Sequence, residues 1–144
     1  MIKTDLKKFI VFGGLFLTLF MVACGDDEPG EPEETPQEIA EALFTGNWSL
    51  GTITLDGTDV SNEYQGFTLT VSIGTYATTN AGELFPATGT WDWVGDSDAQ
   101  ITTGTGKQIT LNTLTSTSLQ FSFNKTDGNA VAGIPGDYVI TLSK

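Results

Sequence analysis

The sequence predicts an all-β protein: a small antiparallel up-and-down β-barrel of about eight strands, with a short N-terminal helix, preceded by a signal peptide and a disordered linker. Three observations predict the barrel. Short runs after Asn47 alternate apolar with polar side chains, which is the period of half-buried strands. Gly, Asn and Asp separate these runs at hairpin spacing. The folded part has roughly 100 residues, enough for one domain with a small core.

A secretory signal is expected over residues 1–23. Three lysines precede the uncharged run Phe9 to Ala23, and this run ends directly before Cys24. A basic start, an apolar run of this length and a small residue at the cut are typical of export signals. A membrane span would need about 20 apolar residues and a stop-transfer flank.

The residues Met21-Val22-Ala23-Cys24 resemble the lipobox of bacterial lipoproteins, although Met21 stands where leucine is usual. The resemblance implies that Cys24 is diacylated, becomes the new N-terminus and anchors the protein in a membrane. Cys24 is the only cysteine of the chain, so it has no disulfide partner. The alternative is an ordinary signal peptide with an incidental cysteine.

The next residues, Gly25-Asp26-Asp27-Glu28, resemble the acidic export signals of Bacteroidetes lipoproteins. That resemblance implies an outer-membrane location facing the cell exterior, and a plain acidic spacer is the alternative. Residues 24–37 contain acids and prolines but no aromatic or basic residue. Such a segment cannot bury enough apolar surface to order itself, so we expect a flexible, self-repelling linker.

Charge and composition exclude several classes of function. The chain has 18 acidic and 6 basic residues, and its formal charge is −12. Removing residues 1–23, which hold three lysines and one acid, makes the charge −14, so a nucleic-acid partner is excluded. Without histidine or a second cysteine, the chain has no Ser-His-Asp triad, thiol pair or nitrogen–sulfur zinc site. We expect no enzyme, cofactor or metal.

The folded domain is expected over residues 38–144. A short helix is predicted from Glu38 to Phe44, with a frayed continuation of the linker as the alternative. Eight strands follow, at Asn47 to Leu55, Phe67 to Ile73, Thr75 to Thr79, Gly89 to Val94, Gln100 to Thr103, Gln108 to Leu114, Ser118 to Asn124 and Asp137 to Ser143. Short connections predict that neighbours in sequence pair in space.

Two details of these strands are expected from their patterns. In the first strand, Trp48 and Leu50 occupy even-numbered positions, whereas Ile53 and Leu55 occupy odd-numbered positions. Strict alternation would therefore place the two pairs on opposite faces of the strand. A β-bulge at Gly51 would return both pairs to the core face and bend the strand. In the second strand, alternation places four apolar residues on the core face: Phe67, Leu69, Val71 and Ile73.

Gly46-Asn47-Trp48 is similar to the Gly-x-Trp signature that opens the first strand of lipocalins. The order of the later stretches, FTLTVSIGTYATTN, FPATGTWDW, SLQFSFNK and YVITLSK, resembles small lipocalin-like domains of Bacteroidetes lipoproteins from about Leu43 to Lys144. In lipocalins a late arginine commonly packs over this tryptophan. Here there is no arginine, and Lys144 is the only basic residue near the end.

The aromatic side chains supply the candidate ligand site. Inward positions are expected for Trp48, Phe67, Leu69, Tyr76, Trp91, Trp93, Leu119, Phe121 and Phe123. Tyr76, Trp91 and Trp93 could form a stacking platform for a sugar or an apolar ligand. Large rings at period two on a central strand are more often core, and an eight-stranded barrel has room for side chains or one small ligand.

Acidic residues give weaker candidates. Asp92, Asp96 and Asp98 contain only fragments of a calcium loop, which needs six or more oxygen ligands, so a solvated turn is favoured. Glu63 and Glu83 could serve a glycosidase only if they lay about 5–10 Å apart across a cleft.

The expected function is a non-catalytic binding or interaction module. Its partners would be the membrane, through the lipid anchor at Cys24, and a small apolar molecule, a glycan or another envelope protein. The loop Thr126 to Gly136 could rim a pocket or merely connect two strands. The alternative is a structural or accessory subunit of an outer-membrane surface complex, with a filled barrel and no ligand.

Overall fold

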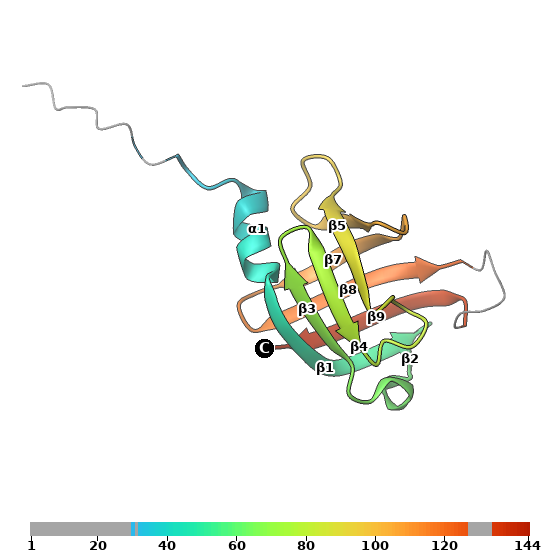
Figure 1. The fold of residues 1–144 in the computed structure, drawn as a ribbon. Helices are drawn as coiled ribbons and strands as arrows, with labels where there is room; N and C mark the ends of the chain where they lie inside the picture. Colours follow the sequence, from blue (N-terminus) through green and yellow to red (C-terminus); the bar gives the residue numbers. More distant parts are fainter. Residues whose placement is uncertain (1–29, 31, 127–133) are drawn as a thin grey trace, which may run out of the picture. The chain divides into compact units, whose positions relative to one another are not determined.

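The structure of the chain is a computed structural model (Figure 1). It describes Gly30, residues 32–126 and residues 134–144. The predicted signal peptide, Cys24, the motif Gly25-Asp26-Asp27-Glu28 and most of the loop Thr126 to Gly136 lie outside the described residues. The chain divides into two units, Met1–Pro32 and Glu33–Lys144, and the second unit contains every element described below.

Eight antiparallel strands close into a barrel in this described part (Figure 1). Each strand pairs with its neighbours in sequence, and β1 also pairs with β9, which closes the ring. The eight predicted strands are confirmed, each within one residue at either end. The barrel strands are β1 (Gly46–Leu55), β3 (Thr68–Ser72), β4 (Thr75–Thr79), β5 (Thr88–Trp93), β6 (Gln100–Thr103), β7 (Gln108–Leu114), β8 (Ser118–Lys125) and β9 (Gly136–Ser143).

The first strand bends at the predicted bulge. The pairing of β1 with β9 shifts between Leu50 and Thr52, which leaves Gly51 as the extra residue. Trp48 and Ile53, on either side of the shift, are fully buried, and Leu50 packs against the same core. A Cβ at Gly51 would lie 2.9 Å from the Thr141 carbonyl oxygen, so the bulge requires glycine.

The N-terminal helix α1 (Pro36–Phe44) is confirmed and begins two residues before Glu38. Thr35 caps it: its hydroxyl accepts from the Glu38 backbone N–H, and the Glu38 carboxylate accepts from the Thr35 N–H. This reciprocal pair is a capping box, and proline suits the first helical turn. Phe44, at the end of the helix, is buried in the barrel core.

Two elements between β1 and β3 escaped prediction. They are the two-residue strand β2 (Thr58–Asp59), which pairs with the end of β1, and the 3₁₀ helix η1 (Ser61–Tyr64). The prediction that Ile73 lies on the core face is wrong. Ile73 is 73% exposed, because it sits in the two-residue turn between β3 and β4, where Gly74 has a φ of +68°.

No helix in the described ranges is both long and apolar enough to cross a membrane.

Candidate functional site

The predicted platform residues come from two strands that pair in the barrel wall. Tyr76 lies on β4, and Trp91 and Trp93 lie on β5. Tyr76 and Trp91 are buried, and Trp93 is partly buried against the core. The other predicted inward residues are all buried: Trp48, Phe67, Leu69, Leu119, Phe121 and Phe123.

Trp91 is held on every side by protein. Its ring meets Phe44 of α1 at 5.2 Å and Trp93 at 5.3 Å between centroids, both edge to face. Its indole N–H donates to the carbonyls of Ser72 (2.9 Å) and Thr75 (3.2 Å), which fixes the turn between β3 and β4. Edge-to-face geometry and a satisfied indole are typical of a core tryptophan. Trp91 therefore has no exposed ring face, whereas Trp93 is only partly buried.

Tyr76 faces a glycine across the strand pair. Its register partner is Gly89, and a Cβ built there would come within 2.5 to 2.7 Å of the tyrosine Cζ, Oη and Cε1 atoms. The ring meets the Phe85 ring edge to face at 6.2 Å. Burial raises the pKa of the Tyr76 hydroxyl above its ordinary value, so the group stays neutral at physiological pH.

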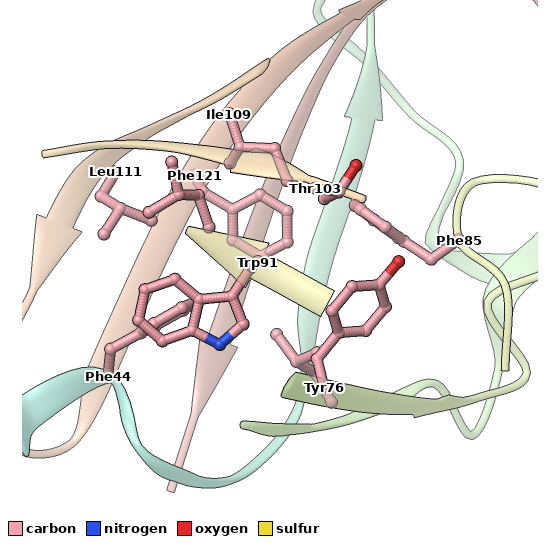
Figure 2. Close-up of a pocket in the computed structure, with 10 residues that line it drawn as sticks. Phe44, Tyr76, Phe85, Trp91, Thr103, Ile109, Leu111 and Phe121 are labelled. Carbon is pink, nitrogen blue, oxygen red and sulfur yellow. The ribbon is translucent and has the colours of Figure 1, made fainter. Parts of the chain in front are cut away.

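The barrel interior contains a small apolar cavity (Figure 2). Its volume is about 30 Å³, room for about one or two water molecules. Figure 2 shows Trp91, Phe121, Tyr76 and Phe85 around it. The complete lining is Phe44, Leu69, Tyr76, Phe85, Trp91, Ile101, Thr103, Ile109, Leu111 and Phe121.

The connection between β4 and β5 plugs one end of the barrel. Leu84 and Phe85 of this connection are buried. The Phe85 ring packs edge to face on Phe121 (6.0 Å) and Phe123 (5.2 Å). We call residues 80–87 the plug loop. It fills the barrel mouth that a ligand would otherwise use.

Lys107 crosses the same barrel end and secures the plug loop. It follows the turn between β6 and β7, and its Nζ lies 4.3 Å from the ring centroids of both Phe85 and Phe123. The ammonium donates to the Leu84 carbonyl. Burial lowers the pKa of Lys107 to about 8, and the nearby positive charge of Lys125 adds to the effect.

Lys144 occupies the opposite end of the fold, beside α1. Its Nζ lies 4.3 Å from the Trp48 ring centroid and donates to the carbonyls of Leu43 (2.9 Å) and Thr45 (2.8 Å). The Trp48 indole N–H donates to the Phe44 carbonyl at 2.8 Å. Both side chains thus satisfy carbonyls that the end of the helix leaves without partners.

The acidic candidates are all exposed side chains. Asp92, Asp96 and Asp98 are exposed, and no cluster of metal-ligating side chains occurs among the described residues. Glu63 and Glu83 are also exposed. Both contribute to the raised pKa of Tyr64, of which burial is the main cause, so they lie near that ring.

No family model, curated protein or solved structure matches the chain.

Sequence reasoning missed the plug loop and Lys107. A signal for the loop is present, since Leu84-Phe85 is an apolar pair inside a segment with Gly82 and Pro86. A lysine between a glycine turn and a strand carries no comparable signal.

Proposed function

We propose that this protein is a lipid-anchored lipoprotein of the outer cell surface whose barrel is a non-catalytic interaction module. Its partner is another envelope protein, which contacts the outside of the barrel. The observation that carries the proposal is the filled interior. Pockets for small molecules usually measure about 300–1,000 Å³, whereas the cavity in this barrel measures about 30 Å³.

The outer wall supports a contact of this kind. The outward residues of β3 and β4 are small and uncharged, and Thr68, Thr70, Ser72, Thr75 and Thr79 are all exposed. A shallow depression of about 450 Å³ lies over β3, β4 and β5. In a chain with a formal charge of −12, an uncharged wall lets a second acidic protein approach without charge repulsion.

The lipocalin-like family is part of the proposal, and Lys144 supports it. The ammonium of Lys144 packs over Trp48, which is the place that the resemblance gives to an arginine. Both are cations that can rest on an indole face. The likeness concerns the scaffold, since the plug loop and the aromatic core occupy the volume where a lipocalin would hold its ligand.

Native mass spectrometry of the mature chain carrying Cys24→Ser tests the filled barrel. The expected spectrum contains the mass of the chain with no retained small molecule. A retained molecule of several hundred daltons, lost on denaturation, would overturn the proposal and restore the ligand-binding alternative.

Membrane fractionation tests the anchor. Wild-type protein is expected with the outer membrane and exposed to added protease on intact cells. The Cys24→Ser variant is expected in the soluble fraction. Two or three acyl chains hold a protein on a membrane, and the variant carries none. Continued sedimentation of the variant with membranes would contradict lipid anchoring.

Site-specific photo-crosslinking tests the partner. A crosslinking side chain at Thr70, on the exposed wall, is expected to give one discrete adduct with an envelope protein in intact cells. The same group at Asn112, exposed on β7, is the control. Equal adducts from both positions would indicate nonspecific proximity and would overturn the assignment of the wall.

A further inference from the structure

An apolar groove lies beside α1 on the surface of the described unit. Its volume is about 330 Å³. Ile39 is 47% exposed, and Leu43 and Leu114 are only partly buried. Helix α1, the end of β7 and the turn between β5 and β6 supply the lining of the groove: Pro36, Ile39, Ala40, Leu43, Leu114 and Asp98. The groove therefore offers apolar surface that an occupant would remove from water.

Local contacts hold the walls of the groove in place. A spacing of four residues puts Ile39 and Leu43 on one side of α1. In the first turn of the helix, the side-chain amide of Gln37 donates to the carbonyls of Gly95 and Ser97, both at 2.8 Å. These bonds tie α1 to the turn between β5 and β6, so the groove is present without an occupant.

Both of these segments are acidic. Asp98 lines the groove, and Asp96 lies in the same turn. The helix and the residues just before it add four acids: Glu33, Glu34, Glu38 and Glu41. No lysine or arginine occurs in residues 9–106, and the ammonium of Lys144, at the end of α1, is engaged by two backbone carbonyls. The matching occupant is apolar on one side and positively charged at its edges.

Charge disfavours the other occupants within reach. The segment before α1, residues 25–35, has six acids among its eleven residues and no large apolar side chain. A second copy of the chain would bring the same acids to the groove, and an anionic lipid surface would be repelled by them. A basic segment of a different protein meets neither objection.

We propose that the α1 groove binds an amphipathic helix of a partner protein, and that the polar side of this helix is basic. Apolar side chains at positions i, i+3 or i+4, and i+7 of the partner helix pack on Ile39, Leu43 and Leu114. Its lysine or arginine side chains lie against Asp98 and the acids of α1. The groove shares no residue with the depression over β3, β4 and β5, so it does not depend on the contact proposed there.

A designed peptide tests the groove directly. The probe is a fluorescent helix of about 18 leucine and lysine residues, with leucine at helical spacing, and the control peptide has glutamate in place of lysine. Fluorescence anisotropy with the Cys24→Ser chain is expected to show saturable binding of the lysine peptide, weakened by salt, and no binding of the glutamate peptide. Absence of binding by the lysine peptide, or equal binding of both peptides, would overturn the proposal.

Matched variants separate the groove from general attraction between opposite charges. Ile39→Ser is expected to weaken binding about fivefold or more, whereas Ile134→Ser, at an isoleucine 59% exposed outside the groove, should leave it unchanged. Asp98→Asn is expected to weaken binding about two- to fivefold, whereas Glu63→Gln, which removes the same charge outside the groove, should not. All four side chains are exposed, and circular dichroism checks that each variant folds. Equal effects within either pair would contradict binding at the groove.

Phosphatidylcholine vesicles test a lipid surface as the occupant. The Cys24→Ser chain is expected not to sediment with them. Sedimentation that is lost in the Ile39→Ser variant would overturn the proposal in favour of lipid. None of these measurements involves Thr70, so failure of the groove and failure of the outer-wall contact are distinguishable.

Discussion

The ammonium of Lys144 lies 4.3 Å from the centroid of the Trp48 ring. The same group donates to two carbonyls at the junction between α1 and β1. One side chain beyond β9 therefore holds the helix, the first strand and the tryptophan in a single arrangement. A cation over an indole is worth about 0.5–1 kcal/mol at an exposed site.

Lys144→Ala is expected to lower the free energy of unfolding by about 1–2 kcal/mol, because the cation–π contact and two hydrogen bonds are lost. Lys144→Arg is the matched control, since it keeps the charge and the donors. Urea denaturation followed by tryptophan fluorescence measures both. Equal stability of the alanine variant and the wild type would show that the contact contributes nothing.

Phe85→Ala is expected to destabilise the fold by roughly 3–5 kcal/mol, because the plug loop loses its buried ring and a cavity forms. Benzene is expected to bind that cavity and raise the melting temperature of the variant alone. The control is Ile73→Ala at an exposed position, which should change stability by less than about 0.5 kcal/mol. A benzene effect of the same size on wild-type protein would argue against a plugged barrel.

Gly89→Ala is expected to cost about 1–3 kcal/mol, since the new Cβ would overlap the Tyr76 ring. Tyr76→Leu is expected to be destabilising by itself but to remove this clash, so the double variant should be more stable than the sum of the two changes predicts. Thermal unfolding of the wild type, the two single variants and the double variant gives the coupling free energy between the two positions. Simple additivity would mean that the ring does not confine Gly89.

Stability is expected to rise between about pH 8 and pH 10. The pKa of Lys107 in the fold is about 8, below its ordinary value near 10.4. Between these values the unfolded chain binds more protons, so the free energy of unfolding increases with pH. Above about pH 10 the buried Tyr64 and Tyr76 oppose this rise, because burial raises their pKa values in the fold.

The rise is bounded by about 1.4 kcal/mol per pH unit for one group, and it is smaller here because Lys107 is partly exposed to solvent. Urea titrations at four pH values from 7 to 10 measure it. Lys107→Met is expected to lose the slope. The same slope in both proteins would assign it to other groups.

The strands were predictable because alternation is a local signal that each strand carries by itself. The bulge was predictable for the same reason. Strict alternation would place Trp48 and Ile53 on opposite faces of the strand, and both can face the core only if Gly51 is an extra residue. Ile73 was misassigned because alternation does not show where a hairpin turns. The glycine that follows it was the better signal, as its positive φ ends the strand.

The candidate site was less predictable, because its state depends on residues distant in sequence. The strands that carry Tyr76, Trp91 and Trp93 were predicted correctly, and they pair in the sheet. Whether these rings were open depended on Phe44 from α1 and Phe85 from the plug loop. The pKa of Lys107 likewise depends on burial between rings from two other segments, which no local pattern encodes.

The seam between β1 and β9 also has a consequence for the order of folding. Residues 49–55 pair with residues 138–143, so the ring cannot close until β9 has been synthesised and has paired with β1. Non-local strand pairing is slow to form. Until β9 has paired with β1, the chain is expected to remain an open sheet, and it becomes rigid only when this last seam forms.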